Sequence, residues 1–148
     1  MKTKGFTLVE LIIVIAIVGI IAAIVMIAFN TSRAKAYDAR IKMVVHQLRT
    51  LGEVYYYNNE YSFSGYDTCL GTPNEANCPG KLAEAVSTLK GELTRSNSSG
   101  PNVTATSSSF CVGAPLATDS TQAFCKDAEG HSELTETATV CTSTLCAP

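Results

Sequence analysis

Neither proline nor cysteine occurs in the first 68 residues of this chain. Proline is the strongest helix breaker, because it lacks a backbone N–H and its ring clashes with the preceding turn. Its absence, together with only two glycines (Gly19 and Gly52) between residues 7 and 58, excludes an obvious break in a long helix. All cysteines and all prolines come later, so the two parts of the sequence have different chemistry.

Charge is missing from residues 11–29, which read LIIVIAIVGIIAAIVMIAF. At about 1.5 Å per residue this run makes a helix of roughly 28 Å, close to the ~30 Å hydrocarbon core of a bilayer. The run is also longer than the apolar region of an ordinary secretory signal. Basic residues flank both ends, so the positive-inside bias is weak. We expect the short basic N-terminus in the cytoplasm and everything after residue 30 outside.

Histidine is scarce, and no C-x-x-C motif occurs. His46 and His131 have no zinc-like spacing to a cysteine pair, and neither lies in a motif with a nucleophile and an acid. A calcium site is an alternative role for Asp127, Glu129 and Glu133. Their spacing does not fit an EF-hand loop, so a solvated acidic turn is the favoured interpretation. The sequence therefore predicts no catalytic residue, no metal and no cofactor.

The cysteines all lie on the side expected to be outside the membrane. They are Cys69, Cys78, Cys111, Cys125, Cys141 and Cys146. An even number in a small exported domain indicates a disulfide framework, although six cysteines allow fifteen pairings and sequence cannot choose among them. Our expectation is sequential pairing: Cys69 with Cys78, Cys111 with Cys125, and Cys141 with Cys146. The middle pair would join two neighbouring strand candidates and close a loop worth roughly 3 kcal/mol in the chain-entropy model.

An apolar stripe at helical spacing follows the uncharged run. Its members are Tyr37, Ile41, Val44, Leu48, Leu51 and Tyr55. Steps of four and three place them on one face of a helix, which should cover a sheet. The helix is expected to end near residue 58.

The remaining elements are shorter. We expect a loop over 59–80, a helix over 81–93, a polar loop or weak edge strand over 95–109, and strands over 109–114, 122–127 and 133–141. The predicted fold is α+β: a long N-terminal helix packed on a small antiparallel sheet. The predicted divisions are a leader (1–5), a transmembrane or assembly helix (6–31), its amphipathic half (32–58) and a disulfide-stapled head (59–148).

The head is acidic. Residues 60–148 contain four Lys or Arg and ten Asp or Glu. Binding to nucleic acid depends mainly on cations that neutralise phosphates. No direct nucleic-acid binding is therefore expected of the head.

Glu10 is the one acid in the apolar helix, and it needs an explanation. A carboxylate inside a spanning helix costs roughly 2.5–3.5 kcal/mol on insertion scales, so such a residue is functional by default. If the chain is cut after Gly5, the new α-amino group of Phe6 becomes a cation that can pair with Glu10 of the same chain or of another copy. The alternative is that Glu10 lies solvated among lipid headgroups without a partner.

The segment KGFTLVELIIVIAIVGIIAAI resembles the N-termini of type IV pilin precursors and the related pseudopilins. It combines a basic leader, the Gly5–Phe6 junction, Glu10 and the apolar run. This resemblance implies cleavage between Gly5 and Phe6 by a prepilin peptidase and N-methylation of Phe6. It also implies that Glu10 pairs with the Phe6 amine of a neighbouring subunit.

The same resemblance implies the partners and the location. The precursor would be a single-pass protein of the inner (cytoplasmic) membrane. The mature chain would form a homo-oligomeric helical filament, an extracellular pilus, with the help of a pilus assembly platform and its ATPase. The implied role is that of a major pilin. The alternatives are a pseudopilin of a type II secretion system, or a minor pilin acting as a tip adhesin or DNA receptor. Motility, adhesion and DNA uptake all stay open, as do glycosylation and melting of the helix near Gly19.

Overall fold

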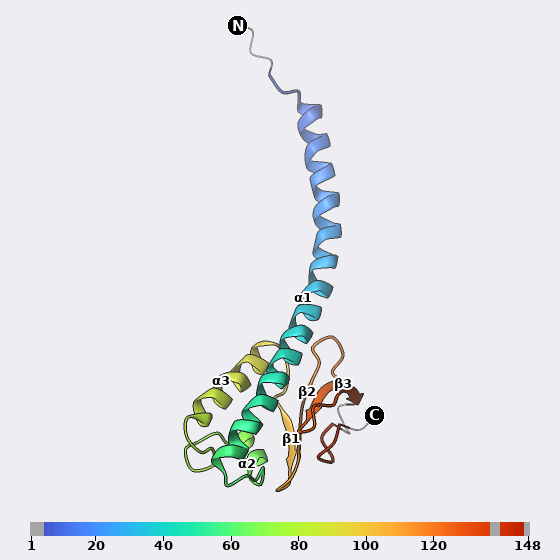
Figure 1. Ribbon diagram of the computed structural model, residues 1–148. Helices are drawn as coiled ribbons and strands as arrows, with labels where there is room; N and C mark the ends of the chain where they lie inside the picture. The colour runs from blue at the N-terminus through green and yellow to red at the C-terminus, as the bar shows by residue number, and fades with distance from the viewer. Residues whose placement is uncertain (1–4, 137–139, 147–148) are drawn as a thin grey trace. The chain divides into compact units, whose positions relative to one another are not determined.

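The computed structural model describes residues 5–136 and 140–146. The chain separates into two compact units, Met1–Ala34 and Lys35–Pro148, and each is described by itself. The elements, shown in Figure 1, are α1 (Leu8–Asn58), α2 (Tyr66–Gly71), α3 (Leu82–Arg95), β1 (Asn102–Ala105), β2 (Phe110–Pro115), β3 (Gln122–Asp127) and β4 (Ser132–Glu136).

The long helix α1 ends where the sequence predicts, at Asn58. Just beyond it, Glu60 and Tyr61 adopt positive φ angles of 51° and 60°, a left-handed conformation that cannot continue a helix. The Tyr61 N–H donates to the Tyr56 carbonyl oxygen at 3.0 Å, which satisfies one of the last carbonyls of the helix.

The predicted stripe of α1 forms the centre of the core of the second unit. Its buried members are Ile41, Val44, Leu48 and Tyr55, and the structure adds Val45, while Leu51 is partly buried against the same cluster. Opposite them lie alternate residues of β2, namely Phe110, Val112 and Ala114, all fully buried. This packing of a helix on a sheet confirms the α+β prediction.

The sheet has the order β1-β2-β3-β4, and all neighbouring strands are antiparallel. The predicted strand over 122–127 is β3, and the predicted strand over 109–114 is β2 shifted by one residue. The predicted last strand was too long: β4 ends at Glu136, and Val140 and Cys141 lie in a turn. Residues 137–139 of that prediction lie outside the described residues.

Two polar side chains of α1 form hydrogen bonds with backbone groups next to the strands. Asp38 accepts hydrogen bonds from the N–H groups of Ala117 (2.7 Å) and Thr118 (3.1 Å), at the connection between β2 and β3. Arg49 Nη2 donates to the Ala128 carbonyl oxygen at 2.6 Å, just after β3. Because these bonds lie before and after β3, they fix the register of the helix along the sheet.

The prediction of a loop over 59–80 was wrong in part. This region contains the short helix α2, with Tyr66 and Leu70 buried in the core. Lys90 Nζ of α3 donates to the carbonyl oxygens of Leu70 (2.8 Å) and Gly71 (2.7 Å), and so caps the C-terminal end of α2. A six-residue helix has too little periodicity to be seen in sequence, and its capping lysine comes from a distant segment.

The disulfides follow only part of the sequential expectation. Cys69 pairs with Cys78 as expected, but Cys111 pairs with Cys141 and Cys125 pairs with Cys146. The strand register explains the correction, because Cys111 lies opposite Asp127, whereas Cys125 lies opposite Gly113. Cys111 and Cys125 are therefore diagonal neighbours, about 7–8 Å apart in an antiparallel pair, which is too far for a disulfide. The C-terminal segment supplies the partner of each.

We predict that mass spectrometry of unreduced peptides will find the Cys111–Cys141 and Cys125–Cys146 links. Replacing Cys111 and Cys141 together by serine should lower the free energy of unfolding by about 3–4 kcal/mol, because this disulfide closes the longest loop. The matched control replaces Cys69 and Cys78. Their disulfide closes a shorter loop, so its removal should lower the free energy of unfolding by less. A recovered Cys111–Cys125 peptide would contradict the assignment.

Tyr66 makes stability depend on alkaline pH. Its ring is fully buried, its hydroxyl donates to the Leu48 carbonyl oxygen, and burial raises the pKa of that hydroxyl. The folded state therefore keeps this proton at a pH where the unfolded chain, with a tyrosine pKa of about 10, has lost it. The contribution is fully present below that pH and is lost above it, at up to ~1.4 kcal/mol per pH unit.

We expect Tyr66→Phe to lose about 1 kcal/mol at neutral pH, from the missing hydrogen bond, and to show a weaker loss of stability between pH 10 and 11. Urea unfolding of the full-length chain in detergent micelles, from pH 7 to 11, measures both effects. Tyr57→Phe is the control, because Tyr57 is exposed. If the free energy of unfolding falls equally steeply with pH between pH 10 and 11 in wild type and in Tyr66→Phe, the assignment is refuted.

Candidate functional site

The amino-terminal start of α1 is a capping box built by Thr7 and Glu10. A carboxylate oxygen of Glu10 accepts a hydrogen bond from the Thr7 backbone N–H at 2.9 Å and one from the Thr7 hydroxyl at 2.7 Å. The Glu10 N–H in turn points to the Thr7 hydroxyl oxygen at 3.3 Å. The two residues thus satisfy each other's free groups at the helix start. A negative charge in the first turn also interacts favourably with the helix dipole.

This capping box is the part of the site that the sequence interpretation missed. The signal was present, since Thr7-Leu8-Val9-Glu10 has the T-x-x-E spacing of the motif and precedes an apolar run. In the structure Glu10 has a partner within its own chain. The alternative in which Glu10 has no partner at all therefore does not hold for this conformation. Glu10 nevertheless remains exposed, and its carboxylate is open to a second partner.

The structure does not bring Glu10 to a free amine at Phe6, because in the uncut chain the Phe6 nitrogen belongs to the peptide bond with Gly5. Both Gly5 and Phe6 are exposed and precede the helix, with the Phe6 side chain 83% exposed. A peptide bond in such a position is accessible to a protease without unfolding a helix.

The first unit leaves its apolar helix uncovered. Large apolar side chains around the whole circumference are about half exposed or more, from Leu8 to Met26 and at Phe29. A helix that is apolar on all sides is stable when lipid or other protein surrounds it. Among the described residues, α1 is the one helix whose length and composition would let it cross a membrane.

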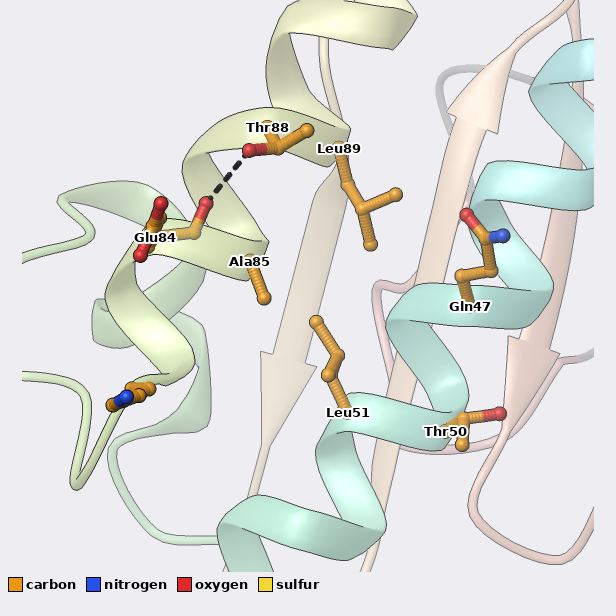
Figure 2. Close-up of a pocket in the computed structure, with 8 residues that line it drawn as sticks. Gln47, Thr50, Leu51, Glu84, Ala85, Thr88 and Leu89 are labelled. Atoms are coloured by element: carbon orange, nitrogen blue, oxygen red, sulfur yellow. Dashed lines mark hydrogen bonds between the residues drawn. The ribbon is translucent and has the colours of Figure 1, made fainter.

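The second unit has a groove between α1 and α3. It has a volume of about 610 Å³, and the side chains of Leu51, Ala85 and Leu89 point into it (Figure 2). Further along the same two helices, Arg40 and Glu92 form an ion pair.

Three cysteine sulfurs, of Cys111, Cys125 and Cys146, lie within 4.8 Å of one another. Such a group could ligate a soft metal if the thiols were free. Here each sulfur is in a disulfide, and a disulfide sulfur has no thiolate to offer. The cluster therefore serves to attach the C-terminal segment to β2 and β3.

Comparison with known proteins finds a matching family model and similar fimbrial proteins. Residues 1–26 match the model described as the prokaryotic N-terminal methylation motif. The fimbrial protein of Neisseria meningitidis serogroup B (strain ATCC BAA-335 / MC58) is 39% identical over 93 residues, which are 62% of this chain and 53% of that protein. The type IV major pilin protein PilE of Neisseria gonorrhoeae is 38% identical over 102 residues, which are 67% of this chain and 59% of that protein.

The chain therefore carries the methylation motif and is similar to type IV major pilins. It spans between half and three fifths of the length of these relatives. No solved structure is a significant match to it.

Proposed function

We propose that this chain is a structural subunit, a major pilin, of a type IV pilus filament. The observation that carries the proposal is an exposed apolar run of helix, uncharged over residues 11–29, that directly follows the capping acid Glu10. The relatives of the chain are named fimbrial protein and type IV major pilin. Such a helix gains by moving from lipid into a bundle of identical helices, where close packing and a few polar contacts select the partner. The role is structural and requires no catalytic residue, metal or cofactor.

Processing prepares the amino-terminal segment for assembly. Cleavage between Gly5 and Phe6 by a prepilin peptidase converts the Phe6 amide into an α-amino group, which is then methylated. This cation stands next to Thr7 and close to the Glu10 carboxylate of its own chain, and it is also available to Glu10 of a neighbour. Pairing across subunits neutralises both charges inside the apolar bundle and sets the axial position of each helix.

Before assembly, residues 6–31 hold the precursor in the inner membrane, with the leader (1–5) in the cytoplasm. Residues 32–58 continue the helix onto the head (59–148), which lies outside the membrane and later covers the filament. An assembly platform with its ATPase moves the subunits from the membrane into the extracellular pilus. The acidic head takes no direct part in nucleic-acid binding.

Electron microscopy of cells with and without the gene, combined with mass spectrometry of sheared filaments, tests the proposal. We expect abundant filaments that require the gene and contain this chain, with methylated Phe6 as the first residue. Loss of enzyme export with pili unchanged would replace the proposal by the pseudopilin role. A product present at only a few copies per filament would replace it by the minor pilin role.

A further inference from the structure

Two disulfides lie against each other on the outer face of the sheet, the face turned away from α1. Cys111 of β2 and Cys125 of β3 are fully buried there, in a cluster separate from the core under α1. Cys111 is bonded to Cys141, and Cys125 is bonded to Cys146. Both partners come from the C-terminal segment, so this face is where that segment is attached to the sheet.

A sulfur of one disulfide lies close to a sulfur of the other. Cys111 Sγ is 3.9 Å from Cys146 Sγ, although these two atoms are not bonded to each other. Together with Cys125 Sγ they lie within 4.8 Å of one another. Cys146 is also partly exposed, so a reagent can reach it from solvent. Thiol–disulfide exchange requires this arrangement, a potential thiolate next to a sulfur of an intact disulfide.

Non-covalent contacts also hold the C-terminal segment on the outer face. Val140 is buried, and a Cβ added at Gly113 of β2 would lie 2.4 Å from Val140 Cγ2. The Thr104 hydroxyl of β1 donates to the Cys141 carbonyl oxygen. These contacts and the second disulfide keep the segment in place when one bond opens. The sulfurs therefore stay at a high effective concentration.

Opening either disulfide creates a thiolate beside the other one. If a dithiol reduces the Cys111–Cys141 bond, the Cys111 thiolate can attack Cys146 Sγ. A Cys111–Cys146 bond forms, the Cys125–Cys146 bond breaks, and Cys125 keeps the electron pair and takes up a proton. If the dithiol reduces the Cys125–Cys146 bond instead, the Cys146 thiolate attacks Cys111 Sγ and Cys141 is the leaving thiolate. Each exchange replaces one disulfide by another, so neither needs an oxidant.

We propose that Cys111 and Cys146 form an exchange disulfide whenever one of the two native bonds on the outer face is open. The trigger is a dithiol reductant, which leaves as its own disulfide, or a new chain in which only one of the two bonds has formed. The C-terminal segment then stays covalently attached to β2, while Cys125 and Cys141 become thiols. The outer face is thus a redox-sensitive switch between attachment to two strands and attachment to one. This switch does not depend on the proposed filament role.

Partial reduction of the full-length chain in detergent micelles tests the exchange. The chain is treated with a limiting amount of dithiothreitol, quenched with acid, alkylated with N-ethylmaleimide and digested without further reduction. Mass spectrometry should find a peptide that links Cys111 to Cys146, together with alkylated Cys125 and Cys141. This measurement uses the wild-type chain, so its result does not depend on the folding of a variant.

Cys141→Ser provides a quantitative readout. This variant deprives Cys111 of its native partner, so Cys111 and Cys125 compete for Cys146. The competing bonds have sequence separations of 35 and 21 residues. Because loop-closure entropy changes slowly with loop length, the two disulfides should occur within about tenfold of each other. The alkylating reagent should accordingly label both Cys111 and Cys125.

Cys78→Ser is the matched control, because Cys69 and Cys78 lie in the core cluster on the α1 side. In this variant we expect alkylation of Cys69 alone. A partially reduced wild type without the Cys111–Cys146 peptide would overturn the exchange. Alkylation of Cys111 alone in a folded Cys141→Ser chain would overturn it as well. Both results would leave the pilin role intact.

Discussion

Replacing Glu10 by alanine should leave the chain in the membrane but nearly stop filament formation. The substitution removes a carboxylate whose insertion into lipid costs roughly 2.5–3.5 kcal/mol, so the variant is more stable in the bilayer. It also removes the partner that we propose for the neighbour's Phe6 amine. The lower cost of insertion alone shifts the equilibrium constant between chain in lipid and chain in the filament by about a hundredfold toward lipid. Filament yield by shearing, against the amount of chain in the membrane fraction, measures the result.

The capping box supplies controls that separate helix capping from charge pairing. Glu10→Gln keeps an oxygen that can accept the Thr7 N–H bond, but it has no charge. Thr7→Val removes the hydroxyl partner while the charge stays, at a cost of about 0.5–2 kcal/mol in helix capping. We expect Glu10→Gln to fail like Glu10→Ala, and Thr7→Val to retain most filaments. Wild-type yields from Glu10→Ala would count against the pairing role.

Phe110→Ala should destabilise the second unit by about 3–5 kcal/mol, the usual cost of removing a large aromatic side chain from a core. Phe110 is fully buried on β2, and its ring centroid lies 4.8 Å from that of Phe63 and 5.1 Å from that of Tyr66. Its ring also occupies the space above Gly52 of α1, where an added Cβ would lie 2.5 Å from Phe110 Cζ. Urea unfolding of the full-length chain in detergent micelles measures the loss.

A double-mutant cycle tests whether this contact is the cause. Gly52→Ala alone should cost about 1–3 kcal/mol, because it overpacks the ring. Combined with Phe110→Leu, the same alanine should cost less, since the smaller side chain leaves room for the new methyl group. Tyr57→Ala, at an exposed position of the same helix, is the control. Additive effects of Gly52→Ala and Phe110→Leu would show that the two residues do not meet in solution.

Local patterns in the sequence were sufficient for the long helix and for most of the head. The uncharged run, the missing prolines and the stripe from Tyr37 to Tyr55 predicted α1 to its last residue, since helical periodicity depends only on neighbours three and four positions away. The strands β2 and β3 were found because a short run of apolar residues between turn residues is also a local pattern. The resemblance of the N-terminal segment agrees with the methylation motif and the relatives.

Tertiary structure alone decided the features that depend on distant partners. Sequence could not pair Cys111 with Cys141, because the choice follows from the register of β2 against β3 and from the path of the C-terminal segment. It could not place α2, whose end is capped by a lysine of α3, or show that Gly52 is there to accommodate a ring from β2. Periodicity is a property of the chain by itself, whereas register and close packing exist only when segments far apart in sequence have come together.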